Sequence, residues 1–378
     1  MKIQHKRPHP TIGFTTERAS AEDTTISICH KAFTCSDDGV SFYELVDNYF
    51  RDYAHDYRSH GVFADTTRLI IIQEDKFGNA VSYINPDYTT AMLYVGSGPR
   101  AMGDLVSEDD VAAVTDIRMP ELAEPVFTGS LAILFTHRFF RYFYYDFTNV
   151  ARARNGLLEE PIHVLDVLAF VHTRALFRDR LSIPEVELEA MLSAGWFPFA
   201  SLPRAILQHM REDAKLSPPN FAVTSMEVAK WMNIDVQQGM LSRWKGREQL
   251  SSHLPFIERA LDRFNQEDYL SACALITSRL EGILRRLGGQ SPTRRRQDAL
   301  IRSITVATDS LSAPNLLPES FQRFLKRFYF KDFDESQMEI PFGRHSLSHG
   351  VVQADALDRD AFIKCFLAID QIVLCTLV

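Results

Sequence analysis

The chain has 378 residues, of which 46% are hydrophobic and 24% are charged, as in an ordinary soluble globular protein. Its length predicts two domains, because single hydrophobic cores usually stop growing at a smaller size. The formal net charge of −8 argues against nucleic-acid binding through the whole surface, although acidic and basic residues roughly balance in the C-terminal third.

Cysteine usage and the apolar runs predict a cytoplasmic protein. Residues 1–10 are polar and contain no apolar signal segment. The apolar stretches 131–147 and 361–378 are both interrupted by charged residues, which predicts core helices and not membrane spans. The cysteines show neither a Cys-x-x-Cys pair nor zinc-site spacing, and their odd number indicates free thiols. They are Cys29, Cys35, Cys273, Cys365 and Cys375.

Residues 1–125 are predicted to form a mixed α/β region. The first 40 residues look irregular, and apolar side chains at helical spacing predict a helix over 41–57. Two strands are predicted over 68–73 and 76–84, joined through a turn with glycine and asparagine. A third strand is predicted over 91–95. This region is therefore expected to hold a small β-sheet.

Residues 126–246 are predicted to form a helical middle region. Apolar spacing of the helical type recurs in four segments, 131–147, 161–178, 186–194 and 202–212. The run 216–220 contains paired prolines, which stop a helix, and is the best candidate for a linker. A second boundary is predicted near Gly246.

Residues 247–378 contain the densest chemistry of the chain, placed between helical patterns at 254–270, 271–287 and 358–378. Arg344, His345 and His349 fall within six residues, and in a helix the two histidines would lie on one face. An imidazole can take a proton from one oxygen and return one to another, while a guanidinium presents a fixed fork to phosphate oxygens. This pattern suits cleavage of a phosphodiester with no cofactor and no metal, by activation of a ribose 2′-hydroxyl.

The Arg-His-x-x-x-His pattern, with the helices before and after it, resembles the motif of HEPN domains, small helical bundles found in bacterial toxins and antiviral ribonucleases. The resemblance implies a homodimer whose two motifs form one site that cuts RNA and leaves a 2′,3′-cyclic phosphate. It also implies that Arg344 steadies the phosphate, that His349 transfers the proton and that His345 fills the polar position. Some toxin members carry a tyrosine two positions after the histidine, where this chain has Val351.

Further residues are candidates for accessory roles. Glu281 is the acidic residue expected to approach the motif, either orienting a histidine or holding Arg344 by a salt bridge, and the alternative is a pair with Arg285 in its own helix. The basic run after two glycines is predicted either to contact RNA phosphates or to be a solvated loop; it consists of Arg294, Arg295 and Arg296.

Two other groups of residues favour structural interpretations. A metal site formed by Asp52, His55, Asp56 and His60 is disfavoured, because the histidine spacing does not share a helix face and a further ligand is not obvious. The basic and aromatic residues of 321–328 predict an amphipathic core helix with a solvated basic face.

The sequence thus predicts an α+β, predominantly α-helical protein. A C-terminal HEPN-like helical bundle would follow an N-terminal region with a small β-sheet and several helices. The predicted function is metal-independent endoribonuclease, with RNA and a second copy of the chain as partners and no membrane. The alternative is a non-catalytic HEPN-like dimerisation or interaction protein. A purely structural interpretation of the motif is also open, in which Arg344 pairs with Asp355 or Asp358 and the histidines donate to backbone carbonyls.

Overall fold

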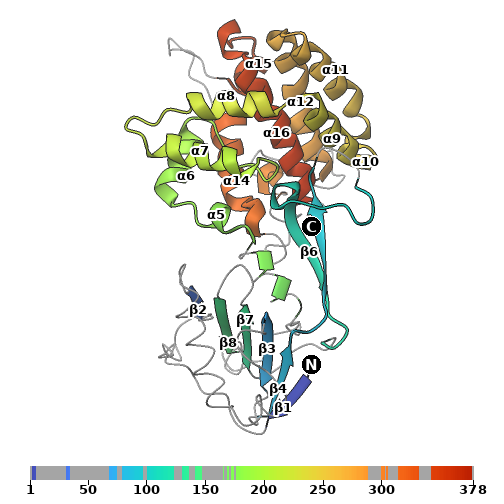
Figure 1. Ribbon diagram of the computed structural model, residues 1–378. Helices are drawn as coiled ribbons and strands as arrows, with labels where there is room; N and C mark the ends of the chain where they lie inside the picture. The colour runs from blue at the N-terminus through green and yellow to red at the C-terminus, as the bar shows by residue number, and fades with distance from the viewer. Residues whose placement is uncertain are drawn as a thin grey trace. The chain divides into compact units, whose positions relative to one another are not determined.

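The computed structural model of the protein divides into two compact units (Figure 1). The first comprises Met1–Thr90 and Asp116–Ala169, and the second comprises Ala91–Thr115 and Phe170–Val378. The structure is α+β and predominantly helical, as predicted. It describes residues 2–5, 31–34, 68–74, 79–96, 100–122, 130–135, 141–146, 165, 168–169, 172–173, 176–287, 299–302, 304, 314–331 and 342–376.

A six-stranded antiparallel sheet forms the first unit, with the strand order β1-β4-β3-β7-β8-β2. Residues Leu69 to Ile72 of the interior strand β3 are all buried, as expected for a strand that is covered on both faces. The strands are β1 Lys2–His5, β2 Lys31–Thr34, β3 Leu69–Glu74, β4 Ala80–Ile84, β7 Ser130–Phe135 and β8 Arg141–Asp146.

The predicted strands over 68–73 and 76–84 are confirmed as β3 and β4, but the predicted helix over 131–147 is wrong. That segment forms β7 and β8, which pair with each other. Periodicity cannot separate a short apolar strand from a helix turn, and the aromatic run of β8 favours a strand. Two strands also lie in residues 1–40, where no regular structure was expected. The helix predicted over 41–57 lies outside the described residues.

A two-stranded sheet of β5 (Thr89–Tyr94) and β6 (Val111–Arg118) confirms the strand predicted over 91–95. The short 3₁₀ helix η2, Glu108–Asp110, precedes β6. Within the second unit, Val95 O accepts a hydrogen bond from Arg243 Nη1 at 2.8 Å, and Ala112 O accepts one from Asn315 Nδ2. Side chains of the helical part therefore hold the backbone just after β5 and at the start of β6.

The second unit is helical and is organised around α16 (Arg359–Cys375), which contacts α8, α9 and α12 (Figure 1). From Ala361 to Cys375 every residue except Lys364 is buried, the pattern of a helix that is covered on all sides. No helix among the described residues is both long enough and apolar enough to span a bilayer. The other helices are α5 Arg178–Leu181, α6 Glu185–Ser193, α7 Arg204–Lys215, α8 Ala222–Trp231, α9 Ile234–Trp244, α10 Glu248–Ser251, α11 Leu254–Asn265, α12 Tyr269–Leu287, η3 Pro314–Leu316, α14 Pro318–Phe324, η4 Leu325–Tyr329, α15 Arg344–Ser348 and η5 Ala354–Ala356.

Buried polar groups fix the C-terminal half of α16. The carboxylate of Asp370 is fully buried and accepts hydrogen bonds from Trp244 Nε1 at 2.8 Å, from Arg243 Nη2 at 3.1 Å and from Ser201 Oγ. The adjacent Gln371 donates to Leu316 O at 2.8 Å and accepts from Ala200 N at 2.8 Å. A buried charge is tolerated when it is paired and hydrogen-bonded, and this arrangement meets that condition.

The predicted helices of the last two thirds are otherwise present. The segments 186–194 and 202–212 form α6 and α7, and the segments 254–270, 271–287 and 358–378 form α11, α12 and α16. The described residues between 165 and 176 are helical, as expected for 161–178.

The predicted boundaries at 125 and 246 do not coincide with those of the two units. The run 216–220 is a turn within the second unit, where the buried carboxylate of Asp213 accepts hydrogen bonds from Thr224 N at 2.9 Å and Oγ1 at 2.8 Å. Gly246 follows α9 in the same unit. Paired prolines stop a helix, but α7 and α8 on either side of the run 216–220 still pack together.

Candidate active site at the Arg344 motif

The motif segment folds as the single-turn helix α15, Arg344–Ser348, with His349 as its C-cap. Ser346 is buried, donates from Oγ to Gly343 O at 3.1 Å, and accepts at its carbonyl from Val351 N at 3.0 Å. Gly350 has φ of +70°, a left-handed conformation that glycine adopts without a steric penalty and that commonly ends a helix. The backbone of the motif is therefore tightly determined at both ends.

Arg344 forms an ion pair with Glu281 of α12, in which its Nε faces Oε2 of the carboxylate. The other carboxylate oxygen, Oε1, accepts from Arg285 Nε at 2.9 Å and Nη2 at 2.6 Å. Glu281 therefore makes both contacts between which the sequence could not decide. Its side chain is 13% exposed and that of Arg344 is 32% exposed, so the pair is shielded on the Glu281 side and accessible on the Arg344 side.

The two histidines of the motif lie in the same helical turn as Arg344, or at its end. Nδ1 of His345 lies 3.5 Å from Nη1 of Arg344, and His349 N donates to His345 O at 3.0 Å in a helical hydrogen bond. His345 is partly exposed and His349 is exposed. Helical spacing of four residues brings the two imidazoles to one side of the turn. Arg344 and His345 are thus brought together at an accessible surface, and the exposed His349 ends the same helical turn.

Tyr329 contacts the helix that carries Glu281, the ion-pair partner of Arg344. Sequence reasoning did not identify this residue. It is the last residue of the π-turn η4 and is fully buried. Its hydroxyl donates to Thr277 O and accepts from Glu281 N at 3.2 Å. Burial raises the pKa of Tyr329 well above its usual range, so the hydroxyl keeps its proton. No residue pattern in the sequence marks the π-turn that brings this hydroxyl to α12.

The remaining site candidates have other positions. Arg294, Arg295 and Arg296 lie outside the described residues, as do the residues considered for a metal site between 52 and 60. In the described part of the chain, no three His, Cys, Asp or Glu side chains gather in a way that could hold a metal ion.

The basic face of α14 and η4 is solvent-accessible, as predicted, with Lys326 and Arg327 exposed, and two of its arginines also pair with carboxylates of α6. Arg323 pairs with Glu185 at 2.6 Å and with Glu189, and Arg327 pairs with Glu189. The aromatic residues Phe321 and Phe324 are fully buried, in agreement with the predicted core helix.

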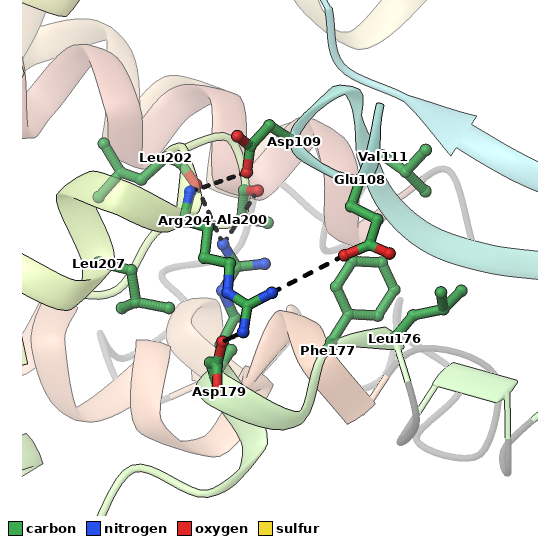
Figure 2. A pocket seen from close by; sticks show the side chains of 11 residues that line it. Glu108, Asp109, Val111, Leu176, Phe177, Asp179, Ala200, Leu202, Arg204 and Leu207 are labelled. Carbon is green, nitrogen blue, oxygen red and sulfur yellow. Dashed lines mark hydrogen bonds and ion pairs between the residues drawn. The ribbon is translucent and has the colours of Figure 1, made fainter. Parts of the chain in front are cut away.

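A small pocket elsewhere in the second unit is lined by five charged and six apolar residues (Figure 2). Arg204 bridges its walls through Asp179 at 2.5 Å and Glu108 at 3.9 Å, and Arg204 N donates to Asp109 at 2.9 Å. Burial lowers the pKa of Arg180 to about 10. The cavity measures about 50 Å³, whereas small-molecule sites usually have roughly 300 Å³ or more. The pocket is therefore too small to hold a nucleotide.

Comparison of the chain with family models, with curated proteins and with solved structures found no match. The HEPN resemblance accordingly rests on the motif and its surrounding helices.

Proposed function

We propose that this chain is a metal-independent endoribonuclease of the HEPN type. The observation that carries the proposal is the arrangement around Arg344. Contacts to Glu281 at Nε and to His345 at Nη1 fix the plane of its guanidinium, while the side chain keeps an exposed fraction of 32%. A guanidinium oriented before the substrate arrives is the preorganised cation that stabilises a phosphorane-like transition state.

In the proposed reaction, an imidazole of the motif, assigned to His349, takes the proton from a ribose 2′-hydroxyl. The 2′-oxygen then forms a bond to phosphorus as the bond from phosphorus to the 5′-oxygen breaks. Arg344 stabilises the charge on the non-bridging oxygens, and an imidazolium returns a proton to the leaving 5′-oxygen. The products are a 2′,3′-cyclic phosphate and a 5′-hydroxyl. The imidazolium that protonates the 5′-oxygen is proposed to come from a second copy of the chain. The role proposed for the enzyme is in defence or toxicity in the cytoplasm.

The competing function is a non-catalytic scaffold that dimerises through the C-terminal helices. The Glu281 ion pair favours it as well, because a satisfied arginine on a largely buried carboxylate also serves as a helix-to-helix link. The two functions differ in what removal of the exposed His349 does. A scaffold tolerates the loss, whereas the nuclease loses its proton-transfer group.

The deciding experiment incubates the purified full chain with total cellular RNA and maps the ends of any fragments. Arg344→Ala and His349→Ala are each expected to abolish cleavage, and the wild-type fragments should carry 2′,3′-cyclic phosphates. Matched controls are Arg279→Ala, an arginine of α12 that stacks on Phe256 at 4.3 Å, and His209→Ala, an exposed histidine of α7. The proposal is contradicted if the wild-type protein leaves the RNA intact, or if cleavage persists in both motif variants.

A further inference from the structure

Tyr329 contacts two backbone groups of α12 that belong together. Thr277 O and Glu281 N are the acceptor and donor of one i to i+4 pair in a regular α-helix, and the hydroxyl of Tyr329 reaches both. Thr277 adds a second polar contact to the backbone of α12, because its Oγ1 donates to Cys273 O at 2.7 Å. A hydroxyl inserted at the hydrogen-bond ladder and a threonine bonded to the preceding turn are both known to bend a helix.

The hydroxyl of Tyr329 is linked to the motif through Glu281. Glu281 is the residue whose backbone N–H binds the hydroxyl of Tyr329 and whose carboxylate pairs with Arg344. On the motif side, Gly343 packs against the end of the same π-turn, since a Cβ built on it would lie 3.5 Å from Tyr329 O. Tyr329 therefore touches the helix that supplies the carboxylate through its buried side chain, and it adjoins the segment that supplies the arginine through its backbone carbonyl.

We propose that Tyr329 is a positioning residue for the Glu281–Arg344 pair. The role as an aid to RNA cleavage rests on the proposed nuclease function, but the positioning itself does not. By accepting from Glu281 N, the hydroxyl fixes the backbone from which the Glu281 side chain leaves α12, and this determines where the guanidinium of Arg344 is held. The hydroxyl belongs to the last residue of the π-turn η4. Such turns occur often at functional sites.

The test is Tyr329→Phe, which removes one oxygen and keeps the ring in its contact with Phe330. The first readout is the NMR signal of the Arg344 Nε–Hε group, assigned with an Arg344→Lys sample, which a purely structural tyrosine would leave unchanged. We expect this signal to shift in Tyr329→Phe and not in Tyr269→Phe, a tyrosine at the start of α12 whose ring contacts Phe264. An unmoved Arg344 signal in a folded Tyr329→Phe overturns the inference.

The second readout is RNA cleavage in a double-mutant cycle with Glu281→Gln. Tyr329→Phe is expected to lower kcat roughly tenfold or more with little change in KM, as displacement of a catalytic group does. Because Tyr329 acts through Glu281, the double variant should be no slower than Glu281→Gln alone. If the rate loss of the double variant equals the product of the two single losses, the inference is overturned.

Two further outcomes are separable. If the wild-type chain leaves RNA intact but the Arg344 signal is shifted in Tyr329→Phe, the nuclease function is disproved and the positioning role is supported. If Tyr329→Phe does not fold, 3-fluorotyrosine at position 329 retains the hydroxyl and changes its acidity. The Arg344 signal is then expected to move in that sample, and an unmoved signal overturns the inference.

Discussion

Nε of Arg344 faces Oε2 of Glu281, so the arginine of the motif helix α15 is held by a carboxylate of α12. The same carboxylate binds Arg285 through its other oxygen, which leaves Glu281 shared between two cations. An incoming phosphate would compete with Glu281 for the guanidinium. The ion pair thus fixes the direction of Arg344 and also sets the interaction that a substrate has to rival.

The fork of Arg344, and not its charge alone, is expected to be required. Arg344→Lys keeps a cation but loses the planar arrangement that contacts Glu281 at Nε and His345 at Nη1. We expect RNA cleavage to fall about a hundredfold, which corresponds to a misplaced catalytic group. Single-turnover cleavage rates measure this, with Arg279→Lys as the matched control. Near wild-type rates in Arg344→Lys would show that a point charge is sufficient.

Chelators are expected to leave cleavage unchanged. The proposed reaction assigns charge stabilisation to Arg344 and proton transfer to the motif histidines, so no step calls for a cation from solution. The measurement compares cleavage rates in EDTA with rates in Mg²⁺, beside a metal-dependent nuclease as the positive control. Strong inhibition by EDTA that Mg²⁺ reverses would contradict the mechanism.

The parts of the fold that the sequence reveals are those with long, regular patterns. The helices α11, α12 and α16 follow from helical apolar spacing, and the approach of Glu281 to Arg344 follows from a carboxylate on the neighbouring helix. The strands β7 and β8 do not follow, because each is too short for periodicity to separate it from a helix turn. Tertiary context decides such segments, here by pairing β7 with the buried strand β3.

The supporting contacts of the candidate site lie beyond sequence patterns for a different reason. Tyr329 contacts α12 from the end of η4, which has the π hydrogen-bonding pattern, and a local change of helix type has no residue signature in this chain. The polar cluster at Asp370 is similar, since an aspartate within an apolar helix cannot show which buried partners it will find. Long-range polar contacts of this kind depend on the packed structure.

Asp370→Asn is expected to destabilise the second unit strongly. The substitution removes the charge that pairs with Arg243 and leaves that guanidinium, whose side chain is 12% exposed, without its counter-ion. Breaking a buried ion pair by removing one partner costs about 3–5 kcal/mol. The control is Asp360→Asn in the same helix, whose pair with the 42% exposed Arg359 should contribute about 1 kcal/mol or less. Urea unfolding of both variants measures the difference, and equal losses would contradict this account of Asp370.

Acid sensitivity of the fold is expected to depend on His172. The residue is 9% exposed, and burial lowers its pKa from 6.5 to about 4. The unfolded chain therefore binds a proton at a higher pH than the folded chain does, so protonation favours unfolding as the pH falls through 6.5. The stability lost by pH 4 is about 3 kcal/mol, at about 1.4 kcal/mol for each pH unit. Below roughly pH 3 both states are protonated and the contribution of His172 stays constant.

The measurement is the free energy of unfolding at a series of pH values between 7 and 4, for the wild type and for His172→Leu. The leucine variant should lose about 3 kcal/mol less than the wild type over this range, because its side chain has no proton to bind. His253 acts in the same direction, since burial and its neighbours Arg286 and Arg279 lower its pKa too, so a residual slope is expected. His209→Leu, at an exposed site on α7, is the matched control and should follow the wild type. Parallel curves for His172→Leu and the wild type would show that this imidazole does not drive the acid response.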